Sequence, residues 1–454
     1  MDLQRWVREA VEAVEAWRGE FGPFTPHPAQ HVGDEDFAEA FRRFSVRIRD
    51  NYPFFHPRYA GQMVKAPHPA AVVGYLAAML VNPNNHAREG GPATADMERE
   101  VVAQLAAMFA LPQHLGHLTS SGTIANLEAL YVAREIHPGR GVAFSQDSHS
   151  SHARMCHVLG MPAYPVAVDE HGRMDLDALE TVLRRHKPGT IVLTAGTTGV
   201  GAVDPIHQAL ELADRYGARI HVDAAYGGFF SLLAGSEGVD AQPWRAIGQC
   251  DSVTVDPHKH GLQPYGCGAV LFSDPAVARH FVHDSPYTYY TPATLHLGEI
   301  SLECSRSGAA AAALWLTFQV LPPTPQGLGA ILSASRRAAH QWADIIEQSQ
   351  HLRLYQQPEL DIVTFFPATD PATLSRIDAA TRRLAETAAE DNLHLSQLRV
   401  SAEAFTRRHD VEPDAEHASI LRSVLIKPEA ETHLSVLHDL LGRRAAPIPT
   451  GAAS

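Results

Sequence analysis

Seven short apolar runs alternate with helical stretches through the middle of this chain of 454 residues, and this alternation constrains the fold most strongly. The runs are Leu115–Thr119, Val142–Ser145, Tyr164–Val168, Thr190–Thr194, Ile220–Asp223, Ser252–Val255 and Ala269–Phe272. Helical periodicity fills several of the gaps between them, for example over 124–134, 176–186 and 207–216. The alternation predicts an α/β fold, with a mostly parallel sheet and helices on both faces. Ligands of such folds bind at the carboxyl ends of the strands.

The remaining sequence predicts three further parts. Residues 1–55 are expected to form a helical arm in front of a large domain over 56–325. Beyond a proline-rich break, residues 326–445 predict a small C-terminal α+β domain, which includes a helix over 371–391 with Asp370 as its N-cap. The tail, 446–454, consists of small residues and proline, and we expect it to be disordered.

Two neighbouring runs end near side chains of opposite charge. Asp223 ends the run from Ile220, and Lys259 closely follows the run from Ser252. Because a free ammonium is costly to bury, a lysine at this place must be solvated, paired or used covalently. A carboxylate at a second strand end suggests an electron-sink cofactor, with Lys259 as its Schiff-base partner and Asp223 facing a pyridinium nitrogen. That cofactor would be pyridoxal 5'-phosphate (PLP).

A cradle for the phosphate of PLP fits the segment Thr119-Ser-Ser-Gly-Thr-Ile-Ala-Asn126, which follows a predicted strand and opens a predicted helix. Small residues allow backbone N–H groups to approach the phosphate, and a helix N-terminus favours an anion. Ser121, Gly122 and Thr123 are the candidate contacts. The alternative is an ordinary serine or threonine N-cap without a ligand.

Other small or aromatic residues could complete the surroundings of the ring. Ala225 leaves room for a ring to lie against the strand. An imidazole from the loop after Ser145 could stack on the outer face of the ring, and this loop contains both His149 and His152. Thr198 could touch the edge of the cofactor or simply belong to a tight turn.

Together these segments resemble the group II PLP-dependent amino-acid decarboxylases, which include glutamate, tyrosine and aromatic amino-acid enzymes. The resemblance covers about residues 50–320. The segments that carry it are His221-Val-Asp-Ala-Ala-Tyr226, Asp256-Pro-His-Lys259, Ser145-Gln-Asp-Ser-His149, Gly196-Thr-Thr198 and Ser305-Arg-Ser-Gly308.

The resemblance implies a role for each matched residue. Lys259 is the Schiff-base lysine, Asp223 the pyridinium partner and His149, in preference to His152, the stacking histidine; these three are the catalytic candidates. His258 is a neighbour of the phosphate or of the lysine. The implied fold is PLP fold type I, as a homodimer with its active site at the subunit interface. The implied reaction is α-decarboxylation of an L-amino acid to the amine and carbon dioxide.

Two departures from the family pattern stand out. Asp256 occupies a position where the animal aromatic enzymes carry asparagine, and a carboxylate there would repel a phosphate unless it were turned away. The loop before Ser305 is shorter than in those enzymes, and its cluster Tyr287, Tyr289 and Tyr290 could supply a proton donor or pack at a subunit contact. The proton that returns to Cα could thus come from a loop tyrosine, His149 or water.

Substrate choice is the least constrained part of the prediction. Gln62, His86 and Tyr289 are candidate substrate-binding residues, although each could instead lie at the surface or at an interface. Because no basic cluster for a second carboxylate is visible, an aromatic or other bulky amino acid is favoured slightly over glutamate. Two other functions stay open, a carbon–carbon lyase of the sphingosine phosphate lyase type and a non-catalytic homologue without PLP.

Composition excludes several further classes. The net charge of −14 argues against non-specific binding to nucleic acid or to anionic membranes. No apolar stretch reaches about 18 residues, so no transmembrane helix is expected. Four cysteines without CxxC spacing favour reduced thiols in the cytoplasm, and the absence of HExxH or a similar motif predicts no metal site.

Overall fold

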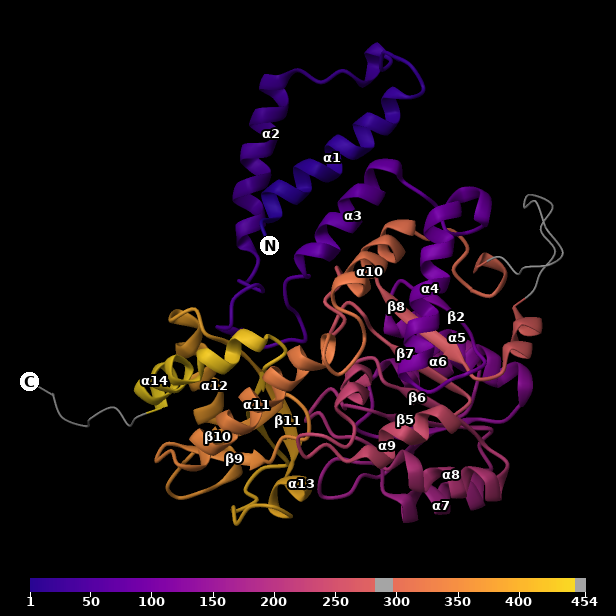
Figure 1. The fold of residues 1–454 in the computed structure, drawn as a ribbon. Helices are drawn as coiled ribbons and strands as arrows, with labels where there is room; N and C mark the ends of the chain where they lie inside the picture. Colours follow the sequence, from indigo (N-terminus) through magenta and orange to yellow (C-terminus); the bar gives the residue numbers. More distant parts are fainter. Residues whose placement is uncertain (282–296, 446–454) are drawn as a thin grey trace, which may run out of the picture.

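A computed structural model describes residues 1–281 and 297–445 of the chain. Its N-terminal arm consists of α1 (Leu3–Gly19) and α2 (Asp34–Arg47), which project from one end of the molecule (Figure 1). Val14 is the one buried residue of these two helices. The predicted disordered tail, 446–454, and Tyr289 lie outside the described residues.

The core of the large domain is a sheet of seven strands in the order β2-β8-β7-β6-β5-β3-β4. Strand β8 is antiparallel to its neighbours β2 and β7, and the other pairs are parallel. The predicted mostly parallel sheet is therefore confirmed. The strands are β2 (Leu115–Thr119), β3 (Val142–Ser145), β4 (Ala163–Val166), β5 (Thr190–Thr194), β6 (Arg219–Asp223), β7 (Ser252–Val255) and β8 (Gly268–Phe272).

Helices cover both faces of this sheet because successive side chains of a strand point to opposite sides. On β5, Ile191 and Leu193 belong to the hydrophobic cluster that includes residues of α4, α7, α8 and α9, whereas Val192 belongs to the cluster formed with α5 and α6. The helices of the large domain are α3 (Pro69–Val81), α4 (Pro92–Met108), α5 (Gly122–Ile136), α6 (Ser151–Leu159), α7 (Leu176–His186), α8 (Ile206–Tyr216), α9 (Ala241–Ala246) and α10 (Gly308–Val320).

The C-terminal domain contains a second sheet, of five strands in the order β1-β11-β12-β10-β9. Its strands are β1 (Tyr59–Ala60), β9 (Leu352–Gln356), β10 (Ile362–Pro367), β11 (His394–Ser401) and β12 (His417–Val424). Its helices are α11 (Leu328–Glu347), α12 (Leu374–Glu390), α13 (Ala402–Thr406) and α14 (Leu434–Ala445). The short β1 lies within the range assigned to the large domain, yet it pairs in parallel with β11.

The predicted cap of α12 was wrong. The helix begins at Leu374, and the side chain of Thr373 accepts a hydrogen bond from the backbone N–H of Arg376 over 3.4 Å. Thr373 has extended backbone and forms a bridge with Glu412, so the helix cannot begin at Pro371. Within the described ranges, no helix is both long enough and apolar enough to cross a membrane.

Candidate active site at the carboxyl ends of the central strands

Asp223 and Lys259 come together because their strands are adjacent. Asp223 is the last residue of β6, and Lys259 follows the end of the parallel neighbour β7. Both line a cavity of about 240 Å³. The same cavity is lined by the other residues predicted to contact PLP, which are Ser121, Gly122, Thr123, His149, Thr198, Ala225 and His258.

The carboxylate of Asp223 is buried and held from two sides. Its Oδ2 accepts a hydrogen bond from His152 Nε2 over 2.8 Å, and its Oδ1 accepts one from the backbone N–H of Ala225 over 3.1 Å. Burial alone would raise the pKa of Asp223, but the bond from His152 and the charge of Lys259 hold it well below its usual range. Asp223 is therefore a carboxylate at neutral pH.

Lys259 forms an ion pair with Asp256, whose Oδ2 lies 2.9 Å from Lys259 Nζ. Burial opposes the charged ammonium, yet the carboxylates of Asp256 and then Asp223 raise the pKa of Lys259 above its ordinary value. A neutral, nucleophilic amine at Lys259 thus requires that a proton leave this pair.

Asp256 is not turned away from the predicted phosphate cradle. A Cβ added to Gly122 would lie 2.7 Å from Asp256 Oδ2, so the carboxylate lies against the first residue of α5. Asp256 Oδ1 is buried and has no hydrogen-bond partner among the described residues. The repulsion expected from the sequence is reduced because the ammonium of Lys259 offsets the charge of Asp256.

The residues of this cavity fit PLP. Gly122 and Thr123 lie in the first turn of α5, where backbone N–H groups have no acceptor within the helix. The side chain of Ser121 caps the helix by accepting from the N–H of Ile124 over 3.4 Å. An anion-binding helix end, an ionised carboxylate and a lysine therefore surround one cavity, as the phosphate, ring nitrogen and aldehyde of PLP require.

The two histidines of the loop after β3 have different surroundings. His149 is exposed, lines the cavity and has its Nδ1 2.7 Å from Ser151 Oγ. His152 is buried and contacts Asp223 instead of the cavity. The sequence did not predict this second role, because only the fold shows which side of the sheet the first turn of α6 faces.

The structure does not bring the candidate substrate residues into this cavity. Gln62 is exposed, and His86 has its Nδ1 3.2 Å from Cys304 Sγ; neither lines the cavity of this chain. Arg422 was not predicted. It donates hydrogen bonds to the carbonyls of Gly199 and Gly61, each over 3.1 Å, and thereby connects the segment beside Thr198 with the segment beside Gln62.

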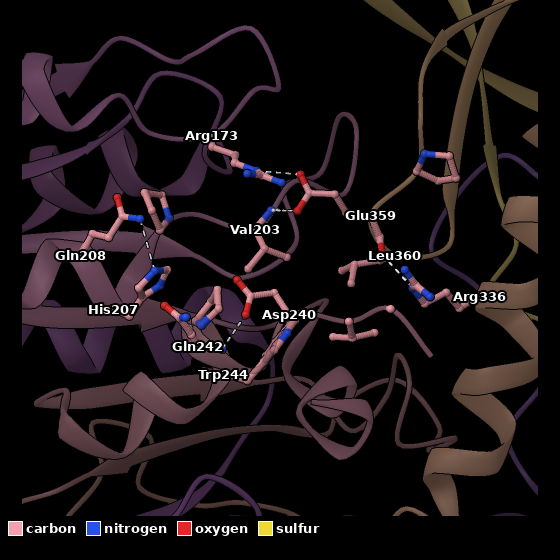
Figure 2. Close-up of a pocket in the computed structure, with 15 residues that line it drawn as sticks. Arg173, Val203, His207, Gln208, Asp240, Gln242, Trp244, Arg336, Glu359 and Leu360 are labelled. Atoms are coloured by element: carbon pink, nitrogen blue, oxygen red, sulfur yellow. Dashed lines mark hydrogen bonds and ion pairs between the residues drawn. The ribbon is translucent and has the colours of Figure 1, made fainter. Parts of the chain in front are cut away.

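A larger cavity, of about 450 Å³, lies between the two domains (Figure 2). Arg173 of the large domain forms an ion pair of 2.9 Å with Glu359, whose backbone carbonyl accepts from Arg336 Nε over 3.0 Å. Asp361, two residues further along, reaches the active site, where it accepts hydrogen bonds from Tyr226 and His260. The segment around residue 360 therefore contacts both cavities.

Comparison with known proteins identifies the family. A family model described as the pyridoxal-dependent decarboxylase conserved domain matches residues 53–367. An L-tyrosine decarboxylase of Enterococcus faecium is 27% identical, over 75% of this chain and 74% of the relative. An aspartate 1-decarboxylase of Aliivibrio fischeri is 32% identical, over 57% of this chain and 52% of the relative.

Solved structures show the same fold. The crystal structure of mouse CSAD has a TM-score of 0.81 at 22% identity and covers 92% of this chain and 90% of its own. That of Oryza sativa TDC with PLP and tryptamine has a TM-score of 0.80 at 17% identity and covers 98% and 97%. The fold is thus PLP fold type I, as predicted. The chain belongs to the pyridoxal-dependent decarboxylases, and it is a PLP-dependent amino-acid carboxy-lyase.

Proposed function

We propose that this decarboxylase acts on an aromatic or other bulky L-amino acid. The observation that supports this proposal is the charge of the cavity. Among the described residues that line it, Lys259 is the one lysine or arginine, and Asp223 and Asp256 add two carboxylates. A second carboxylate on the substrate would be desolvated there without a cation to pair with, which is costly. Tyr226 and Tyr265 supply aromatic surface instead.

The proposed roles of the residues follow from their places around the cavity. Lys259 would carry PLP, and the N–H groups of Gly122 and Thr123, with Ser121, would hold its phosphate. Asp223 would keep a proton on the ring nitrogen, because its carboxylate stays ionised and buried. When bound, PLP supplies an electron sink for the electron pair left at Cα as carbon dioxide departs.

The remaining cavity residues would shape the space around the ring. Ala225, with its small side chain, would leave room against β6, while His149 would cover the opposite face. Thr198 would lie at the edge of the ring, and His258 beside Lys259. The family model and the decarboxylase relatives favour carbon dioxide release over both the carbon–carbon lyase and the non-catalytic alternative.

We also infer that the enzyme is a homodimer. Large apolar side chains recur on one side of α2, where Phe37, Phe41 and Phe44 are 64%, 55% and 55% exposed. Such a continuous apolar surface is typical of a subunit contact, and a second copy of the chain would cover it in an isologous dimer. Its cytoplasmic location stays a prediction from the sequence.

The proposal is tested by measuring carbon dioxide release from PLP-loaded protein with tyrosine, tryptophan, phenylalanine, aspartate and glutamate. We expect release from at least one aromatic substrate, and its loss in Lys259→Ala by about a thousandfold or more. Release from aspartate or glutamate alone would overturn the substrate proposal and leave the reaction type intact. An aldehyde product from a β-hydroxy amine, without carbon dioxide from any amino acid, would favour the lyase.

A further inference from the structure

His152 lies directly behind the carboxylate of Asp223. It belongs to the first turn of α6, its side chain is 0% exposed, and its Nε2 lies 2.8 Å from Asp223 Oδ2. In the described part of the chain, His152 is the one side chain that forms a hydrogen bond with this carboxylate. The second bond comes from the main chain, at Ala225. The orientation of the Asp223 side chain therefore depends on His152.

The other nitrogen of the ring indicates which protonation state His152 adopts. His152 Nδ1 is buried and has no hydrogen-bond partner among the described residues. A proton on Nδ1 would create a buried donor without an acceptor, which is costly. The ring is therefore neutral, with its proton on Nε2, and donates that proton to Asp223. A neutral donor fixes the carboxylate in place without cancelling its negative charge.

A second buried histidine–carboxylate pair offers a comparison. His117 Nε2 lies 2.8 Å from Glu128 Oε2, and both side chains are 0% exposed. There the remaining ring nitrogen is also engaged, because His117 Nδ1 lies 2.8 Å from the carbonyl of Leu118. Neither residue of that pair lines the cavity. A histidine that serves stability alone is thus satisfied at both nitrogens, whereas His152 is satisfied only toward Asp223.

We propose that His152 is a positioning residue for the cofactor: its Nε2–H holds the Asp223 carboxylate facing the pyridine nitrogen of PLP. The inference rests on the proposed role of Asp223. It predicts that the hydrogen-bond donor, and not the imidazole as such, is what the site requires. Glutamine places an amide N–H at a reach similar to that of Nε2, while leucine fills the space without a donor.

The test compares His152→Leu and His152→Gln with the wild type. Apoprotein is titrated with PLP, and binding is followed through the visible absorbance of the lysine-bound cofactor. We expect His152→Leu to bind PLP about tenfold more weakly or worse, as the loss of a hydrogen bond to a charged group implies, and to show an altered absorbance spectrum. His152→Gln should stay within about threefold of the wild type. In turnover, His152→Leu should lower kcat by about tenfold or more and leave KM nearly unchanged.

Two controls separate this inference from general destabilisation. His117→Gln alters the comparison pair and should lower the thermal unfolding temperature without weakening PLP binding. If His152→Leu does not fold, His152→Asn replaces it, because the asparagine amide is too short to reach Asp223, and the same loss is expected. Each variant is checked by thermal unfolding of the apoprotein.

Several results would overturn the inference. They are a His152→Leu enzyme equal to the wild type in PLP affinity and spectrum, a His152→Gln enzyme as impaired as His152→Leu, and an equal loss of PLP in His117→Gln. If the wild type binds PLP with Lys259, these failures concern His152 alone. A wild-type protein that never binds PLP would defeat the assigned site and this inference together.

Discussion

His260, the residue after Lys259, hydrogen-bonds through its Nε2 to Asp361 of the C-terminal domain over 2.8 Å. The other carboxylate oxygen of Asp361 accepts from the hydroxyl of Tyr226, which follows Ala225 in the chain. All three side chains are buried. The turn that carries Lys259 and the strand end that carries Asp223 are thus both attached to one carboxylate of the other domain.

Asp361→Asn should lower the free energy of unfolding by about 2–3 kcal/mol. An asparagine offers one acceptor oxygen where Asp361 offers two, so its amide would face a second donor. PLP affinity should fall as well, because the turn of Lys259 loses its support. Urea unfolding and PLP titration measure the two effects. Asp414→Asn, at an exposed site near Ser375, should change neither, and equal behaviour of the two variants would contradict the role of Asp361.

Gly122→Ala should weaken PLP binding by about tenfold or more, since its Cβ would lie 2.7 Å from Asp256 Oδ2 and overpacking of this kind costs about 1–3 kcal/mol. Absorbance titration with PLP gives the affinity. The control is Gly442→Ala on α14, where an added Cβ would meet no atom within 4 Å and should leave PLP binding unchanged. Wild-type affinity in Gly122→Ala would show that the start of α5 has space to spare.

Lys427 should make stability rise with pH above about 8. Its Nζ donates to the carbonyls of Tyr59 and Val64 over 2.7 and 2.9 Å, and burial lowers the pKa of Lys427 to about 8. Above that pH the unfolded chain still binds the proton while the folded chain releases it, so folding is favoured increasingly up to the unfolded pKa near 10.4. Below about pH 8 both states are protonated and the dependence vanishes.

The measurement is chemical unfolding of the wild type and of Lys427→Met at intervals from pH 7 to pH 10. The difference in unfolding free energy between them should increase in favour of the wild type by about 1.4 kcal/mol for each pH unit above 8. Other titrating groups cancel in this difference. A constant difference across the range would mean that Lys427 titrates as an ordinary lysine.

Phe41→Glu should convert the proposed dimer to a monomer, because it places a charge in the middle of the apolar side of α2. Light scattering after size exclusion gives the mass at micromolar protein. Arg43→Gln, on the same helix at an exposed polar position, should leave the mass unchanged. A wild-type protein that is monomeric at these concentrations would reject the dimer itself.

The sequence predicted the large domain well because its signals are local. All seven predicted runs form strands of the central sheet, since β-branched runs between helical stretches identify buried parallel strands without knowledge of the rest of the chain. Adjacent strand ends then bring Asp223 and Lys259 together. The strand β1 has two residues, too few for any periodicity, and it was not predicted.

The contacts that hold the site in place could not be predicted in the same way. Asp361 lies 101 positions from His260, and no local pattern identifies it as their partner. His152 and His149 are three positions apart in one loop, and their different roles depend on how the start of α6 is turned toward β6. Long-range pairing and side-chain direction, rather than residue type, decide these contacts.

The pairing of β1 with β11 also bears on the order in which the chain becomes functional during its synthesis. Tyr59 and Ala60 leave the ribosome long before His394 and Leu395, their partners in the sheet. The neighbouring Gly61 likewise waits for Ser396 and Arg422, which donate to its carbonyl over 2.7 and 3.1 Å. Domains fold as units during translation, so the seven-stranded sheet can form first, while the segment from Tyr59 to Gln62 has no place to bind until the last strands are made. A chain that stops before residue 394 would therefore keep its lysine and lose the segments that enclose it.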